Sequence, residues 1–142
     1  MIYSELVKKA CNVLFEAHEF DKDKGGYPYA FHPFFLATQM EGENATCVAL
    51  LHDVIEDHGD RYSFAGFSQM GFPDEVIDAL KLLTHDDSVP YMDYIERIAK
   101  NPIAKAVKLA DLRHNTDTRR VDGKKPKKYE TYLQAIAYLE NA

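Results

Sequence analysis

The chain has 142 residues, which fits one domain, and 46% of them are hydrophobic, enough for a core without disulfide support. A net charge of −6 argues against a general nucleic-acid binder, and no apolar run approaches the roughly 18 residues of a membrane helix. The first ten residues carry charges within an amphipathic pattern, unlike a signal peptide, so we expect a cytoplasmic protein.

Apolar residues at helical spacing predict eight helical segments, four of them in the first half of the chain. The first is capped by Ser4 and extends to about Glu19, and a loop containing adjacent glycines follows it. Three more are expected over residues 29–40, 44–57 and 63–70, each ended by a glycine soon after. Cys11 and Cys47 lie within these patterns and are expected to be buried free thiols.

Four further helices are expected in the second half, over about 73–83, 90–100, 101–115 and 127–140. No segment shows the sustained two-residue alternation of a strand, and neither an internal repeat nor a linker is evident. The sequence therefore predicts an all-α fold, a compact bundle of about seven or eight helices that forms a single domain over residues 1–142.

Four titratable groups stand close together in the stretch from Leu50 to Asp57, which begins apolar. On a continuous helix His52 and Glu56 share one face, and Asp53 and Asp57 share the adjacent one. Adjacent His and Asp offer an imidazole nitrogen and a carboxylate oxygen, a mixture that suits manganese, iron, zinc, cobalt or nickel better than calcium. An adjacent His-Asp pair alone is weak evidence for a metal site, because most such pairs have a structural role.

Two further residues complete a candidate ligand set. His32 stands at a helix start after an aromatic residue, and Asp111 interrupts the apolar face of the helix over 101–115. A buried carboxylate is costly unless it is paired or bound to a metal. Two His and two Asp on three helices are what a one-metal site in a helical bundle needs.

Three motifs carry a resemblance to a known family: Gly26–Pro33 with its terminal His-Pro, Ala49–Asp57 with its His-Asp and Glu-Asp pairs, and Val107–Asn115. In order and spacing they resemble the HD superfamily of metal-dependent phosphohydrolases, in particular the hydrolase domain of RelA/SpoT proteins and their short stand-alone relatives. The resemblance covers nearly the whole chain and implies the HD-domain helical bundle.

The resemblance implies one divalent metal, commonly manganese, held by His32, His52, Asp53 and Asp111. It implies that Glu56 and Asp57 position and deprotonate the attacking water, and that Lys108 and Asn115 face the ribose and phosphates of a nucleotide. The family's reaction removes pyrophosphate from the 3′ position of guanosine tetra- or pentaphosphate. The residues agree with this chemistry, because a metal makes hydroxide available near neutral pH and a nearby carboxylate can take the proton.

One loop departs from the family pattern. The family usually has Gly-Gln, then an Arg that stacks on guanine, then Ser, where this chain has Phe20-Asp21, then Asp23, then Gly25. An Asp cannot stack as a guanidinium does. In its place Lys22 or Lys24 could supply a point charge, and Phe20 or Tyr27 a stacking face.

A basic segment follows the third motif. From Arg113 to Lys128 the chain carries seven cationic residues, which favour either a solvated loop or the steering of an anionic ligand. We expect phosphate steering by Arg119, Arg120, Lys124 or Lys125. Among the other histidines, we expect His18 to pack near the site, and His58 and His85 to be surface residues.

Three functions remain open from the sequence. The leading one is a stand-alone (p)ppGpp 3′-pyrophosphohydrolase with a small-molecule nucleotide substrate and neither nucleic-acid nor membrane partners. The second is an HD phosphohydrolase acting on another nucleotide, a phosphomonoester or the 2′-phosphate of NADPH. The third, from a different class, is a non-catalytic nucleotide or metal sensor. No pattern supports or excludes a homo-oligomer.

Overall fold

The computed structural model describes residues 1–121, 123 and 125–142, with the backbone alone at Arg120 and Val121. Over these residues the fold is all-α, as predicted, and the only β pairing is an isolated bridge between Lys22 and Pro28. The α-helices are α1 (Glu5–Ala17), α2 (Phe31–Thr38), α3 (Glu43–Leu51), α4 (Val54–His58), α5 (Phe64–Gln69), α6 (Asp74–Leu83), α7 (Tyr91–Ala99), α8 (Pro102–Thr116) and α9 (Tyr129–Asn141), and a 3-10 turn covers Thr118–Val121.

The N-terminal helix α1 follows from its sequence. Ser4 has an extended backbone, and its hydroxyl accepts a hydrogen bond from the Val7 amide at 3.2 Å, the N-cap that the sequence predicts. Five apolar residues at helical spacing are buried along one face: Val7, Ala10, Val13, Leu14 and Ala17. The helix ends at His18, whose amide donates to the Leu14 carbonyl.

The helix predicted over residues 44–57 is divided in two. Turn conformation at His52 and Asp53 separates α3 from α4, although both residues keep negative φ angles near the helical region. In an uninterrupted helix the Ala49 carbonyl would accept from the Asp53 amide. Here it accepts from the His52 ring at 2.7 Å. The break therefore directs the imidazole as well as turning the chain.

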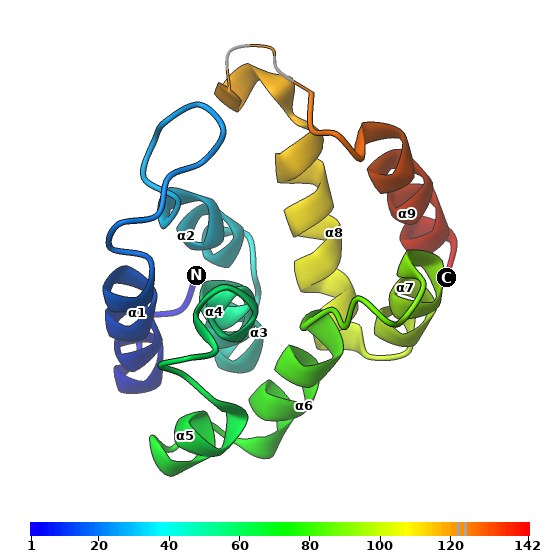
Figure 1. Ribbon diagram of the computed structural model, residues 1–142. Coiled ribbons are helices and arrows are strands. Elements are labelled where there is room, and N and C mark those ends of the chain that lie inside the picture. Colours follow the sequence, from blue (N-terminus) through cyan, green and yellow to red (C-terminus); the bar gives the residue numbers. More distant parts are fainter. Residues whose placement is uncertain (122, 124) are drawn as a thin grey trace.

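The long helix α8 lies in the middle of the molecule, with α1 to α4 on one side and α7 and α9 on the other (Figure 1). Its N-cap is Asn101, whose side-chain oxygen accepts from the Ala104 amide at 3.0 Å, and Pro102 occupies its first turn. The buried side chains of the described residues form one cluster that extends from Val7 in α1 to Leu139 in α9. Because α8 packs against α2, α3, α6, α7 and α9, its residues can meet groups from distant parts of the chain.

Both cysteines are free; Cys47 is buried and Cys11 is half-buried. Within the described part of the chain, no helix combines the length and the apolar character that crossing a membrane requires.

Candidate metal centre and adjoining cleft

Three of the four predicted ligands form a compact group. His32 on α2 and His52 and Asp53 at the break after α3 offer ligand atoms that all lie within 4.8 Å of one another. Both imidazoles are buried, and the Asp53 side chain is 20% exposed. The group therefore has the nitrogen and oxygen donors and the limited solvent access that a transition-metal site needs.

His52 is already oriented as a ligand. Its Nδ1 is fixed by the Ala49 carbonyl, so Nδ1 carries a proton and, in the neutral ring, Nε2 presents its lone pair. That Nε2 is buried and has no hydrogen-bond partner. It lies 3.1 Å from Asp53 Oδ2 and 3.5 Å from Asp111 Oδ1. A cation fits this arrangement, because it would satisfy the buried nitrogen and both carboxylates together.

The fourth predicted ligand, Asp111, stands beside this group on α8. Its Oδ1 lies 2.8 Å from His32 Nε2 and also accepts from Asn115 Nδ2 at 3.1 Å. Its Oδ2 accepts from Lys108 Nζ at 2.9 Å. Lys108 and Asn115, predicted to face the nucleotide, thus hold the Asp111 carboxylate in place.

Two residues that sequence reasoning did not assign also orient the predicted ligands. The rings of His32 and His114 stack at an angle of 5°, with Nδ1 atoms 2.6 Å apart, so one nitrogen donates to the other. With the proton on His32 Nδ1, the Nε2 of His32 is left for a metal. The Tyr29 hydroxyl donates a hydrogen bond to Asp53 Oδ2. His114 lies three positions from Asp111 on α8, a helical spacing that could have indicated it, whereas Tyr29 lies in the turn before α2.

The predicted ligands form a charged cluster at neutral pH. Burial by itself would raise the pKa of Asp53, but the charge of His52 outweighs this effect and lowers the pKa to about 2. Burial likewise opposes ionisation of Asp111, yet Lys108 and the two imidazoles hold its pKa well below the usual range. Burial lowers the pKa of His52, but Asp53 and Asp111 more than compensate and raise it. Two carboxylates are therefore available as anions to a cation.

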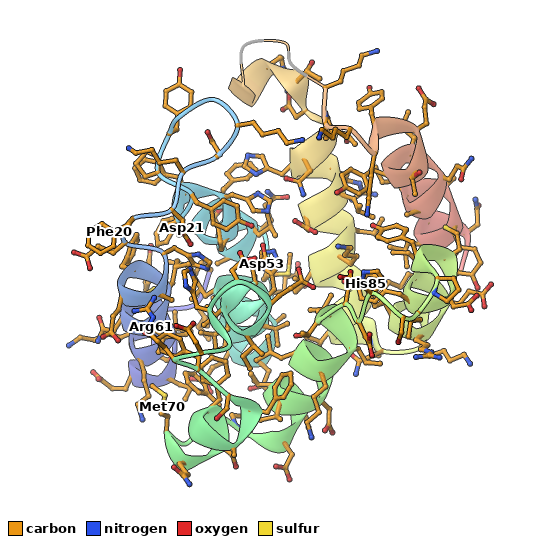
Figure 2. The ribbon with its side chains drawn as sticks, in the orientation of Figure 1. Phe20, Asp21, Asp53, Arg61, Met70 and His85 are labelled. Atoms are coloured by element: carbon orange, nitrogen blue, oxygen red, sulfur yellow. The ribbon has the colours of Figure 1, made fainter. Side chains whose placement is uncertain are left out.

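A cleft of about 400 Å³ opens next to His52 and Asp53, within the size range of small-molecule sites. Glu56 lines it, and its Oε1 accepts from the His85 amide at 2.8 Å. Figure 2 shows His85 on the far side of Asp53 from Asp21. His85, expected at the surface, instead lines the cleft and packs against the Tyr94 ring at 4.5 Å. The rest of the lining comprises two lysines, three tyrosines, a leucine and an aspartate: Lys108, Lys128, Tyr91, Tyr94, Tyr132, Leu83 and Asp87.

The two carboxyls predicted to act on water differ in position. Burial raises the pKa of Glu56, and the His85 amide partly offsets that rise. Burial first, and then the charges of Asp53 and Glu56, raise the pKa of Asp57 to about 6. Both residues are exposed, and in the described structure Asp57 does not line this cleft. Glu56 is therefore the carboxyl better placed to act on a ligand in the cleft.

The cationic residues predicted to contact or steer phosphates in the loop before α2 and after α8 do not line the cleft, as far as the structure describes them. Lys24 is exposed in the loop before α2, and Arg119 is 89% exposed and makes two 2.9 Å hydrogen bonds to Asp117. Neither lines the cleft, whereas Lys128 does. Lys125 stacks its amine over the Tyr129 ring at 4.8 Å. Lys124 and the side chain of Arg120 lie outside the described residues.

The loop that departs from the family pattern is held by Asp23. Its Oδ1 accepts from the amides of Gly25 and Tyr27 at 2.9 and 3.0 Å, and backbone bonds close the loop around it. Gly26 follows at a φ of +84°, which favours glycine. Asp23 therefore shapes the loop, while the aromatic rings of Phe20 and Tyr27 are 86% and 49% exposed.

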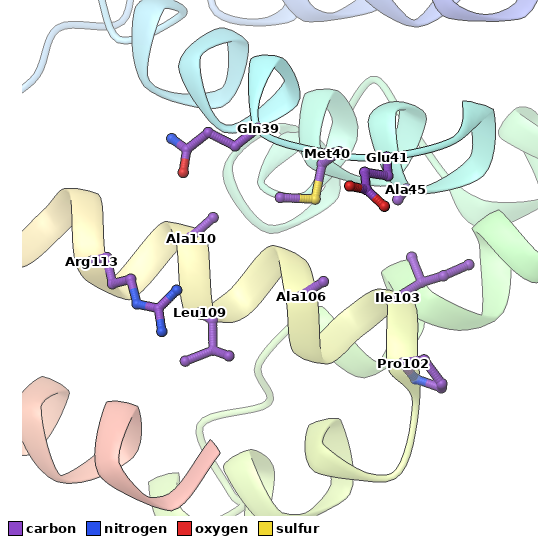
Figure 3. Close-up of a pocket in the computed structure, with 10 residues that line it drawn as sticks. All are labelled: Gln39, Met40, Glu41, Ala45, Pro102, Ile103, Ala106, Leu109, Ala110 and Arg113. Carbon is purple, nitrogen blue, oxygen red and sulfur yellow. The ribbon is translucent and has the colours of Figure 1, made fainter. Parts of the chain in front are cut away.

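A second cavity, of about 480 Å³, lies between the α2–α3 connection and α8 (Figure 3). Its lining is mainly apolar, with Glu41 and Arg113 as the charged residues. It contains none of the predicted metal ligands.

A helical bundle that buries an ordered nitrogen and oxygen donor set beside a carboxylate-lined cleft has the construction of a metal-dependent hydrolase. One of the comparisons with known proteins agrees with a hydrolase. A solved structure of a metazoan ortholog of SpoT, described as hydrolysing ppGpp and playing a role in starvation responses, superposes with a TM-score of 0.76 at 25% identity, over 99% of this chain and 86% of that one.

The sequence is also 30% identical, over 149 aligned positions, to a probable GTP pyrophosphokinase of Mycobacterium leprae (strain TN). The match covers 94% of this chain and 19% of that relative, so the chain spans about a fifth of its length. No family model matches the sequence. The two relatives confirm the resemblance to RelA/SpoT proteins that the three motifs predict.

Proposed function

We propose that the chain is a metal-dependent (p)ppGpp 3′-pyrophosphohydrolase, with one divalent cation, Mn²⁺, held by His32, His52, Asp53 and Asp111. The observation that carries the proposal is the buried Nε2 of His52, which has no hydrogen-bond partner. It lies between two ionised carboxylates, at the wall of a cleft that Glu56 also lines. The fold shared with a metazoan SpoT ortholog supports the substrate.

A divalent cation in this site would lower the pKa of a bound water and offset negative charge on the phosphoryl group. Residues of the chain would carry out the proton transfer and hold the groups that take part in it. Glu56 accepts the proton of the attacking water, because its raised pKa brings the carboxylate nearer to the range of an effective general base. The His85 amide fixes one oxygen of Glu56. Asp57, which does not line the cleft in the described structure, assists from outside it.

Substrate phosphates are held by the cationic side chains of the cleft. Lys128 lies with its amine 5.7 Å from the centre of the Tyr91 ring, and both residues line the cleft. The Tyr91 hydroxyl is buried without a hydrogen-bond partner, so it can donate to a phosphate oxygen. Lys108 and Asn115 each donate one hydrogen bond to Asp111, and their remaining N–H groups can donate to the nucleotide. Lys24 and Arg119 contribute as outer charges that steer it.

We also propose that residues 1–142 constitute one domain. The single cluster of buried side chains over the described residues supports this assignment.

The direct test is pyrophosphate release from guanosine tetraphosphate by purified, manganese-loaded protein, beside an Asp53→Ala variant. We expect release from the parent protein and none from the variant, with both folded by circular dichroism. The absence of release from a sample that holds manganese would overturn the proposed substrate.

One observation favours a second candidate, a phosphohydrolase acting on a different nucleotide or phosphomonoester. Asp23 stands where the family has an arginine that stacks on guanine, and its carboxylate is used inside the loop. A panel comparing guanosine tetraphosphate, its adenosine counterpart and NADPH distinguishes the two. Preference for either of the latter would place the specificity change in residues 20–27.

A further inference from the structure

A second group of metal-binding side chains lies outside the centre described above. We propose that His18, Asp21 and His58 form a site for another divalent transition metal of the zinc and cobalt class. Asp21 Oδ2 lies 2.8 Å from His18 Nδ1 and 2.5 Å from His58 Nε2. The ligand atoms of the three residues all lie within 4.8 Å of one another. In Figure 2, Asp21 is seen toward the α1 side of Asp53.

The backbone holds these side chains in place before any ion arrives. His18 caps the C-terminus of α1, and His58 is the last residue of α4. Between them, the Asp21 amide donates to the His18 carbonyl at 3.1 Å, and the Tyr29 amide donates to the Asp21 carbonyl at 2.9 Å. Such preorganisation lowers the entropy cost of binding.

The donor set suits zinc or cobalt. Two imidazoles and a carboxylate are three protein ligands, which leave the fourth tetrahedral position to water. The His18 side chain is completely buried, while His58 and Asp21 are 20% and 33% exposed, so the open position faces solvent. Burial raises the pKa of Asp21, but hydrogen bonds from the two rings outweigh it and keep the carboxyl ionised.

The cluster is incompletely satisfied as a set of hydrogen bonds. His18 is 2% exposed, and its Nε2 is buried without a partner. A buried imidazole with an unmet nitrogen lowers stability, so such a group in a native fold calls for an explanation such as an ion or a water. The His18 nitrogen that faces Asp21 is Nδ1, so a metal there would leave Nε2 without a partner, and the proposal stands on the positions of Nδ1, the Asp21 carboxylate and His58 Nε2.

Arg61 gives the proposal a distinctive consequence. Its Nη2 donates to the Ala17 carbonyl at 2.9 Å and lies 3.4 Å from His58 Nδ1. A metal on His58 Nε2 requires the proton on Nδ1. The Nδ1–H would then face the guanidinium of Arg61, and two hydrogen-bond donors would meet. Arg61→Gln removes that charge and supplies an amide oxygen that can accept from Nδ1, so this variant should bind the metal more tightly.

The test counts bound metal and needs no substrate. Zn²⁺ equivalents are measured by elemental analysis after dialysis, and Co²⁺ by its visible absorption. We expect the parent protein to bind two equivalents of metal. Asp21→Asn, His58→Gln and Asp53→Ala should each bind one equivalent. The double variant Asp21→Asn with Asp53→Ala should bind none. Asp23→Asn is the matched control from the same loop and should retain two. Circular dichroism verifies that each variant is folded.

The alternative is a purely structural hydrogen-bonded cluster. One equivalent or none in the parent protein, or two equivalents in Asp21→Asn, would overturn the proposal, as would unchanged or weaker zinc affinity in Arg61→Gln. Because these readouts are independent of nucleotide hydrolysis, they separate failure of this site from failure of the proposed function.

Discussion

Glu56 is the residue at which the catalytic proposal and the sensor alternative diverge. Glu56→Gln keeps the hydrogen bond from the His85 amide but removes the base, so we expect turnover to fall by about 10²- to 10⁴-fold. Metal content and nucleotide affinity, measured by elemental analysis and calorimetry, should be retained. Glu75→Gln on α6, whose carboxylate accepts from Asn44, is the control. Absence of turnover in the parent protein, unchanged in Glu56→Gln, would favour a non-catalytic sensor.

Lys108 makes a buried ion pair with Asp111, with side-chain exposures of 14% and 7%. Lys108→Met leaves the Asp111 charge with less compensation, so we expect the metal-free protein to lose about 3 kcal/mol of unfolding free energy. A bound cation replaces part of the missing charge, so added metal should stabilise this variant more than the parent. Denaturant titrations with and without metal measure both effects. Lys105→Met, at a half-buried lysine on the same helix whose amine contacts only the Ala142 carbonyl among the hydrogen bonds described, should have a smaller effect in each.

Cys47 tests the packing of α3 beneath the metal centre. It is fully buried, and burial, the largest effect, raises the pKa of its thiol to about 12. We therefore expect its alkylation at pH 8 to require opening of the fold, whereas the half-buried Cys11 reacts earlier. Mass spectrometry of partially labelled protein gives the order, and faster labelling of Cys47 would contradict the packing of α3.

At the scale of single elements, α8 positions Asp111, Asn115 and Lys108 at once. Loss of its N-cap in Asn101→Ala should lower the free energy of unfolding by about 1 kcal/mol, because the Ala104 amide loses its acceptor. Thermal denaturation measures the change. Asn141→Ala, at the exposed end of α9, is the matched control and should change stability by less than about 0.5 kcal/mol. Equal effects would contradict the capping role of Asn101.

Most helices could be predicted from apolar spacing and capping residues, as Ser4 and Asn101 illustrate. The break after α3 could not, because the apolar pattern continues across it. At the break the His52 ring donates to the Ala49 carbonyl, a contact that the apolar pattern does not reveal. The positions of His58 and His85 were also missed. Both are held by partners distant in sequence, Asp21 and Glu56, and such pairings leave no local signal.

At the scale of the whole molecule, the candidate centre joins segments that are far apart in the chain. His32 and Asp111 meet although 79 residues separate them. Helical spacing places each residue on a face of its own helix but does not say which faces meet. The expectation that they share a site came from the family resemblance, and the packing of α8 against α2 and α3 accounts for it physically.

Because unfolding separates these segments, the metal should bind only the folded chain. We expect Mn²⁺ at 100 times its dissociation constant to raise the free energy of unfolding by about 2.7 kcal/mol. The measurement is best made in Asp21→Asn, where only this centre would bind. Adding Asp53→Ala should abolish the increase, and an increase that persists would place the ion elsewhere.

Tyr29 contacts both histidine clusters, since its ring centre lies 5.0 Å from that of His18 and 5.6 Å from that of His32, while its hydroxyl donates to Asp53. The chain contains no tryptophan, so its near-ultraviolet spectrum arises from tyrosine and phenylalanine. An ion that takes the Asp53 carboxylate changes the partner of the Tyr29 phenol. The protein thus carries an intrinsic chromophore whose difference spectrum reports occupancy without any label.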